Sequence, residues 1–134
     1  MNVLGLLVLA PGLERTMRRW RFLVLYLGAG IGGMLLVQLL SALGDHQRTL
    51  VVGASAGVMG LVAGELVRIL RSRLPGERWW RQRQVAGIGV LLLLQTIFDA
   101  SHPAVSQTGH IGGFLAGLLL ASLLLPAPAK ERPG

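Results

Sequence analysis

The sequence contains no cysteine, and its charged and aromatic residues are scarce. The absence of cysteine excludes a disulfide framework and any metal site built from thiolates. Charged residues make up 14% of the 134 residues and aromatic residues 5%, while the mean hydropathy is +0.60. A soluble domain needs more polar surface than this composition provides. The composition therefore indicates a membrane protein.

The chain instead carries a series of long apolar segments. A helix needs about 20 consecutive apolar residues to cross a bilayer core, and residues 22–44, 49–70 and 104–129 reach this length. Residues 49–70 are interrupted only by Glu65 and Arg68 near their end, and His110 is the only ionisable residue in 104–129. Residues 84–98 form a shorter run that we interpret as a fourth span, and residues 1–13 are apolar but too short to cross. We therefore predict an all-α polytopic membrane helix bundle with about five membrane segments, the first of them incomplete.

We expect the boundaries of these segments where proline, glycine and charged residues gather. The first segment should break at Ala10-Pro11-Gly12, because proline and glycine end helices. Residues 71–84 should form a connection with a turn at Leu74-Pro75-Gly76, and residues 99–109 a loop on the opposite face. The whole of residues 1–126 would be one membrane domain, followed by a short polar cytoplasmic tail at residues 127–134.

The basic residues are placed in a way that indicates topology. The formal net charge is +7, from 13 basic and six acidic residues. If every apolar segment crosses, twelve of the 13 basic residues lie on one face, and only Arg48 lies on the other. Because Lys and Arg accumulate on the cytoplasmic face, we expect the basic connections and the C-terminus to be cytoplasmic. The protein would be an integral, multi-pass protein of a bacterial-type inner or plasma membrane, with the lipid bilayer and not nucleic acid as its partner.

A serine among glycines stands near the start of the central segment. Ser55 is the middle residue of Gly53-Ala54-Ser55-Ala56-Gly57 and would lie roughly 10 Å below the outer boundary. The spacing of four nearby glycines places them on one helix face, which suits close packing against a neighbouring helix: Gly53, Gly57, Gly60 and Gly64. Ser55 points nearly the opposite way, so the two faces should touch different neighbours.

Two interpretations of Ser55 stay open at this point. Serine in a membrane helix commonly packs between helices or donates to the carbonyl four residues earlier. Alternatively, Ser55 is a nucleophile. The Gly-x-Ser-x-Gly pattern also occurs at the nucleophile elbow of α/β-hydrolases, but that elbow requires a preceding strand, and membrane segments flank the motif here.

His110 is the one ionisable residue well inside the final apolar segment, at the outer end of a small-residue stripe that includes Gly113 and Gly117. Small residues allow two helix backbones to approach closely, and Ser55 and His110 should lie at similar depth. Because a serine hydroxyl becomes nucleophilic when a neutral base accepts its proton, the pair predicts a Ser-His dyad. A structural, helix-capping role is the alternative for His110.

The remaining acidic and histidine residues do not indicate a further site. Asp99 is not expected as a third triad member, because it lies eleven residues before His110 at the end of another helix. Four residues are interpreted as loop residues in water, without the ligand spacing of a metal site: Asp45, His46, Asp99 and His102.

The two motifs together resemble those of rhomboid intramembrane serine proteases. Residues 53–60, GASAGVMG, resemble the nucleophile motif of that family, and residues 110–117, HIGGFLAG, resemble its final-helix His-x-x-Gly-x-x-x-Gly motif. Residues 2–14, NVLGLLVLAPGLE, are similar to its second core helix, which carries an Asn followed by a Gly-Pro-x-Leu-Glu-like ending. The resemblance covers nearly the whole chain.

The resemblance implies roles for individual residues. Ser55 would be the nucleophile, and His110 the general base that later protonates the leaving amine. The Ser55 backbone N–H and the Asn2 side chain would be the oxyanion donors, while Gly113 and Gly117 would make the close contact between the last and the central helix. The family implies transmembrane protein substrates with small, helix-destabilising residues, and neither a metal nor an organic cofactor.

The sequence departs from the family pattern at its start and at one position near the nucleophile. The family has a first core helix, an outer loop and a His four residues before the Asn, all of which would lie upstream of Met1. We therefore expect a truncated or mis-started chain. Met59 stands where the family usually has an aromatic residue against the imidazole, and a thioether can also contact an aromatic ring. The alternative function is that of a non-catalytic rhomboid-like protein, a pseudoprotease or truncated form, that binds client transmembrane helices.

Overall fold

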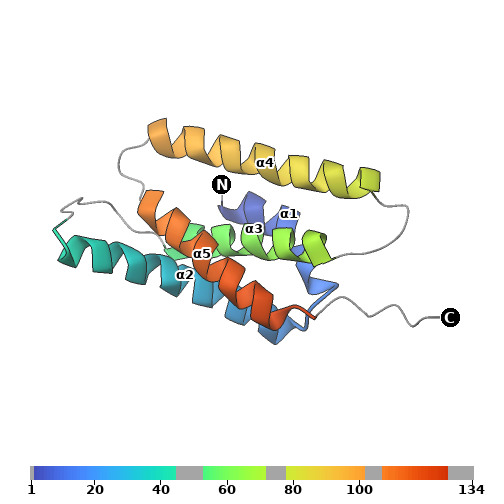
Figure 1. Cartoon of the computed structure of the whole chain (residues 1–134), viewed down its shortest axis with the longest axis horizontal. Coiled ribbons are helices and arrows are strands. Elements are labelled where there is room, and N and C mark those ends of the chain that lie inside the picture. The colour runs from blue at the N-terminus through green and yellow to red at the C-terminus, as the bar shows by residue number, and fades with distance from the viewer. Residues whose placement is uncertain (1, 45–52, 72–77, 102–106, 127–134) are drawn as a thin grey trace.

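A computed structural model describes residues 2–44, 53–71, 78–101 and 107–126 of the chain. These residues form five α-helices, which Figure 1 shows packed side by side: α1 (Asn2–Glu14), α2 (Arg19–Ala42), α3 (Gly53–Arg71), α4 (Arg78–Ser101) and α5 (Gln107–Leu124). The predicted fold class, an all-helical membrane bundle, is confirmed.

Three of the helices are long and apolar enough to cross a membrane, namely α2, α3 and α5. Shorter apolar stretches lie within the other two helices, at Gly5–Glu14 in α1 and Gln82–Phe98 in α4. A helix can cross a bilayer core only if its apolar run is long enough. The division into three clear spans and two shorter segments is therefore the one expected from the sequence.

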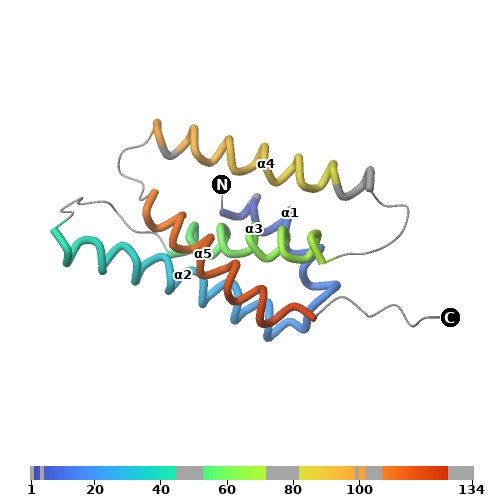
Figure 2. Tube along the Cα trace, viewed as in Figure 1, coloured from blue at the N-terminus to red at the C-terminus, as the bar shows by residue number. Residues whose placement is uncertain are grey.

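Helix α3 is the centre of the bundle. About three fifths of its span is buried, against a third for α5 and less for α2. Helices α2, α3 and α5 contact one another, and α1 and α4 each contact α3. Figure 2 shows α4 on one side of α3, and α2 and α5 crossing each other on the opposite side. The first residues of α3 and α5 lie at the same end of the bundle (Figure 1).

The bounds of α1 and α4 differ most from those expected. Helix α1 continues through Pro11 to Glu14 instead of breaking at residues 10–12. Proline removes one backbone hydrogen bond, but in a membrane helix neighbouring elements can compensate for that loss. Helix α4 begins at Arg78 and not after residue 84, and its last turn contains Asp99, which the sequence analysis placed in a loop. Charged and aromatic residues at a membrane surface are compatible with helix, so polarity alone did not mark these ends.

Two arginines hold the end of α5 at the basic end of the bundle. The Arg71 guanidinium donates to the carbonyl oxygens of Leu125 and Ser122, each at 2.8 Å, and Arg21 Nη1 donates to that of Leu124 at 3.1 Å. The last carbonyls of a helix have no partner within it and carry partial negative charge. Guanidinium groups from α2 and α3 therefore satisfy the C-terminus of α5.

Candidate active site

Ser55 lies in the first turn of α3 as the structure describes it, and it is half-buried. The surrounding glycines and alanines leave no bulky side chain to separate α3 from its neighbours. Small residues at a helix interface allow backbones to approach closely. The local sequence therefore brings a hydroxyl into an interface where another helix is near.

His110 of α5 meets this hydroxyl. Its Nε2 lies 2.9 Å from Ser55 Oγ, although the two residues are 55 positions apart in the chain, and only 5% of the His110 surface is exposed. The distance is that of a hydrogen bond between a nucleophile and its base. For Ser55 to donate, Nε2 must be the unprotonated nitrogen, and the ring proton then resides on Nδ1. The structure thus brings together the two residues that the sequence analysis paired.

Backbone contacts between α3 and α5 set this separation. A Cβ atom on Gly113 would lie 2.8 Å from Ala56 Cα, and one on Gly117 would lie 2.7 Å from the Gly60 carbonyl oxygen. Atoms this close cannot accommodate a side chain, so the two helices touch through their main chains. The contacts at Gly113 and Gly117 follow His110 by about one and two helical turns.

The glycine face of α3 packs mainly on α2. A Cβ on Gly57 would lie 2.9 Å from the Tyr26 carbonyl oxygen, and one on Gly53 would lie 3.0 Å from Met34 Sδ. The expectation that this face and the serine face touch different helices holds at these positions. Gly60 departs from it, because it lies against both Ala29 of α2 and Gly117 of α5. At Gly60, α2, α3 and α5 therefore pack more closely than they would if each face of α3 contacted one helix.

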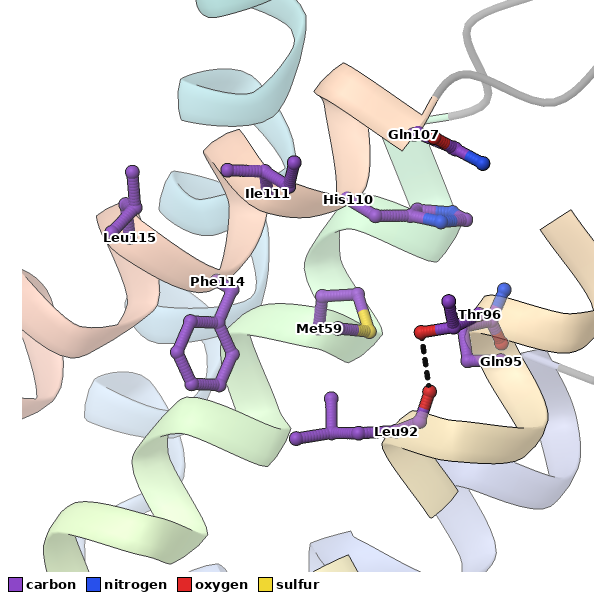
Figure 3. A pocket seen from close by; sticks show the side chains of 9 residues that line it. All are labelled: Met59, Leu92, Gln95, Thr96, Gln107, His110, Ile111, Phe114 and Leu115. Carbon is purple, nitrogen blue, oxygen red and sulfur yellow. Dashed lines mark hydrogen bonds between the residues drawn. The ribbon is translucent and has the colours of Figure 1, made fainter. Parts of the chain in front are cut away.

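A cavity of about 340 Å³ adjoins the imidazole, between α3, α4 and α5. Figure 3 shows the His110 ring pointing into it, with Met59 from α3 below the ring and Phe114 to the left of Met59. Three polar side chains also line it, and the sequence analysis did not assign them to the site: Gln95, Thr96 and Gln107. Gln95 and Thr96 are polar residues within the apolar run of α4, and this polarity was the feature of the sequence that could have assigned them to the site. Thr96 Oγ1 donates to the Leu92 carbonyl within its own helix at 2.8 Å.

The other candidate residues lie elsewhere in the bundle or outside the described residues. Asn2 is the first residue of α1 and is partly buried, on a helix that packs against α3. One turn further along α1, a Cβ on Gly5 would lie 2.6 Å from Val58 Cγ1. The backbone of Asp99 is in α4, whereas Asp45, His46 and His102 fall outside the described residues. Within the described ranges, no three His, Asp or Glu side chains are placed to hold a metal ion.

Comparison with known proteins links this geometry to one family. A model of the Rhomboid domain matches residues 1–127. The chain is 32% identical over 131 residues to RHOMBOID-like protein 4 of Arabidopsis thaliana, and 30% identical over 132 residues to the putative rhomboid protease YdcA of Bacillus subtilis. These alignments cover 96% and 98% of this chain, and 30% and 61% of the two relatives.

A third relative is the rhomboid protease GluP of Bacillus subtilis, 28% identical over 123 residues that cover 92% of this chain and 22% of that protein. The chain spans less than two thirds of the length of each of these three relatives. No solved structure matches the chain.

Proposed function

The chain belongs to the rhomboid family, and from this premise we propose that it is an intramembrane serine endopeptidase. It would cleave peptide bonds in or near transmembrane segments of other membrane proteins, with Ser55 and His110 as its catalytic dyad. The observation that carries the proposal is the 2.9 Å approach of His110 Nε2 to Ser55 Oγ between two membrane helices.

The reaction is acyl transfer in two steps. Ser55 Oγ attacks the scissile carbonyl carbon while His110 Nε2 accepts the hydroxyl proton, and the imidazolium then gives that proton to the leaving amine. Water, deprotonated by the same imidazole, attacks the acyl-serine ester; the bond to Ser55 Oγ then breaks, the imidazolium returns the proton to Oγ, and the acid is released. Each step requires one proton-accepting nitrogen within reach of the serine oxygen, and the observed hydrogen bond satisfies that requirement.

Stabilisation of the tetrahedral oxyanion is assigned to the Ser55 backbone N–H and the Asn2 side chain. Two observations support Asn2. Helix α1 packs against α3, and Asn2 lies one turn before Gly5, the residue of α1 that contacts Val58 of α3. Donors placed where negative charge develops are worth several kcal/mol in a site that excludes water, about 2.7 to 4 for a single donor.

The surroundings of the dyad suit a substrate that arrives from the membrane. The helices that carry Ser55 and His110 are both long and apolar enough to be spans. We place the dyad toward the outer face and the basic connections toward the cytoplasm, in a bacterial-type inner or plasma membrane. The substrates would then be transmembrane proteins, and the reaction needs no metal or organic cofactor.

A serine-directed, mechanism-based reagent tests the proposal in membranes or detergent. Labelling of the wild-type chain that disappears in Ser55→Ala and in His110→Ala is the expected result. Equal labelling of all three proteins would contradict the dyad. Capture of client helices that survives Ser55→Ala, without cleavage or labelling in any form of the protein, would instead support a non-catalytic, client-binding member of the family.

A further inference from the structure

Glu65 is a buried carboxylate that the dyad does not use. It lies on α3 ten residues after Ser55, a distance of about 15 Å along the helix, and only 8% of its surface is exposed. An acidic residue inside a membrane segment is costly, and such residues usually serve substrate or ion recognition.

A second cavity, of about 270 Å³, lies beside Glu65 between α1, α3 and α4. Apart from Glu65, its lining is apolar except for Gln84: Val8, Leu9, Ile69, Gln84, Gly87, Ile88 and Leu91. Val8 and Gln84 are exposed, so the cavity opens on the surface of the bundle. It is therefore an apolar groove with one carboxylate in its wall, in the half of the bundle away from the dyad.

The Glu65 carboxylate has acceptor positions that Arg68 does not use. Arg68, one turn along the same helix, donates to it from Nε at 2.8 Å and from Nη2. A carboxylate has about four acceptor positions, so Arg68 uses two of them. The Arg68 side chain is 20% exposed. A second cation that enters the groove can therefore share the carboxylate with Arg68.

The charge around the groove favours a cationic occupant at Glu65. This end of the bundle carries many arginines, among them Arg18, Arg19 and Arg71. Among the residues whose side chains the structure describes, the acidic ones are Glu14, which is exposed, and Glu65. A basic residue on a partner helix would be repelled by these arginines and attracted at Glu65.

We propose that Glu65 binds a Lys or Arg near the cytoplasmic end of the substrate's transmembrane segment; this inference rests on the proposed protease function. A segment whose N-terminus is outside runs parallel to α3, and its cytoplasmic flank carries Lys or Arg by the same charge rule that orients this chain. When the scissile bond of a helical substrate lies at Ser55, the substrate residue about ten positions after that bond lies level with Glu65. The preferred substrates are thus outside-N segments with a basic residue at that spacing.

A Lys scan of a model substrate tests the spacing with unaltered enzyme. A set of single-span substrates would differ only in one Lys, moved from six to fourteen positions after the scissile bond, with Gln as the reference. We expect kcat/KM in proteoliposomes to peak near the tenth position, at about threefold to tenfold above the Gln substrate. A flat profile across the scan would overturn the proposal.

The enzyme side of the pair is tested by Glu65→Gln, which should remove the peak, so that this variant cleaves the Lys and Gln substrates with the same kcat/KM. Glu14→Gln is the matched control, because it removes an exposed acid at the same end of the bundle, and it should keep the peak. Glu65→Asp retains the charge and should retain part of the preference. A peak that persists at full height in Glu65→Gln would contradict the inference.

Cross-linking separates this inference from the protease proposal. Because the chain has no cysteine, a Cys can replace Gln84 at the groove, in a Ser55→Ala background that binds without cleaving. A substrate with Cys at the eleventh position should form a disulfide with it, more when Lys stands at the tenth position than when Gln does. Cys at Leu93, which is exposed on α4, is the control. Cross-linking that responds to Lys, together with no cleavage by the chain that keeps Ser55, would uphold the groove and reject the protease. Cleavage by that chain without a Lys-dependent cross-link would do the reverse.

Discussion

Gly113 of α5 lies so close to Ala56 of α3 that no side chain fits between the two helices; a Cβ atom there would be 2.8 Å from Ala56 Cα. Ala56 is the residue after Ser55, and Gly113 follows His110 by one turn. This contact therefore sets the distance between the two proposed catalytic groups.

Gly113→Ala should separate α3 from α5 and break the dyad. Overpacking of this kind costs about 1 to 3 kcal/mol of stability, and a displacement of about 1 Å can reduce a reaction rate about a hundredfold. We expect serine-reagent labelling to be nearly lost, as judged by initial labelling rate. Gly89→Ala in α4 is the control, because a Cβ at Gly89 meets nothing within 4 Å. Normal labelling of Gly113→Ala would show that the contact does not position His110.

Arg71→Ala should destabilise the bundle without touching the dyad. The change removes two hydrogen bonds from a guanidinium to the Ser122 and Leu125 carbonyls. A hydrogen bond to a charged group contributes about 1.5 to 3 kcal/mol to the free energy of unfolding. We expect a lower thermal midpoint in detergent, partly restored by Arg71→Lys. Arg19→Ala removes an exposed arginine near the same surface and should leave the midpoint unchanged. Equal effects of the two alanine variants would mean that net charge and not helix capping is responsible.

Asn2→Ala should reduce turnover more than it affects substrate binding. If Asn2 donates to the oxyanion, its removal lowers kcat by about a hundredfold to a thousandfold and leaves KM nearly constant, because the interaction forms only in the transition state. Steady-state kinetics on a model transmembrane substrate separate the two constants. Val3→Ala, at a neighbouring position that is 70% exposed, should leave both unchanged. An increase in KM at constant kcat would assign Asn2 to substrate binding instead.

Ile88→Ala should loosen α4 alone. Ile88 is 6% exposed on a helix whose contacts are almost all with α3, and truncation of a buried isoleucine costs about 2 to 5 kcal/mol at a fully packed site. We expect faster amide hydrogen exchange in α4 with little change in α2, α3 and α5. Leu93→Ala, at a position that is 60% exposed, serves as the control. Faster exchange throughout the bundle would show that α4 is integral to the core.

The sequence was sufficient for the features that have a local signature. Long apolar runs identified the spans, and the similar depth of Ser55 and His110 followed because both lie near the outer starts of their segments. The spacing of Gly113 and Gly117 behind His110 indicated a close helix contact, and the structure has those glycines against α3. These inferences depend on the length of an apolar run or on helix periodicity, and both can be read from a continuous stretch of sequence.

Features that depend on contacts between distant residues were not accessible in the same way. The positions of the basic residues indicated topology, yet Arg21 and Arg71 also donate to carbonyls at the end of α5 that are 103 and 54 residues away. Glu65 appeared only as an interruption of an apolar run, because its groove is formed by α1 and α4 together. The continuation of α1 through Pro11 likewise depends on its packing, since local propensity alone favours a break there.

The main-chain contact between α3 and α5 has a consequence for how the site responds to heat. Glycine has no rotamers, so the contacts at Gly60, Gly113 and Gly117 freeze no side-chain torsions when the two helices associate. The separation of Ser55 from His110 is then fixed by the thickness of two polypeptide backbones, which does not change with temperature. The dyad geometry should persist up to the point at which the helices themselves part.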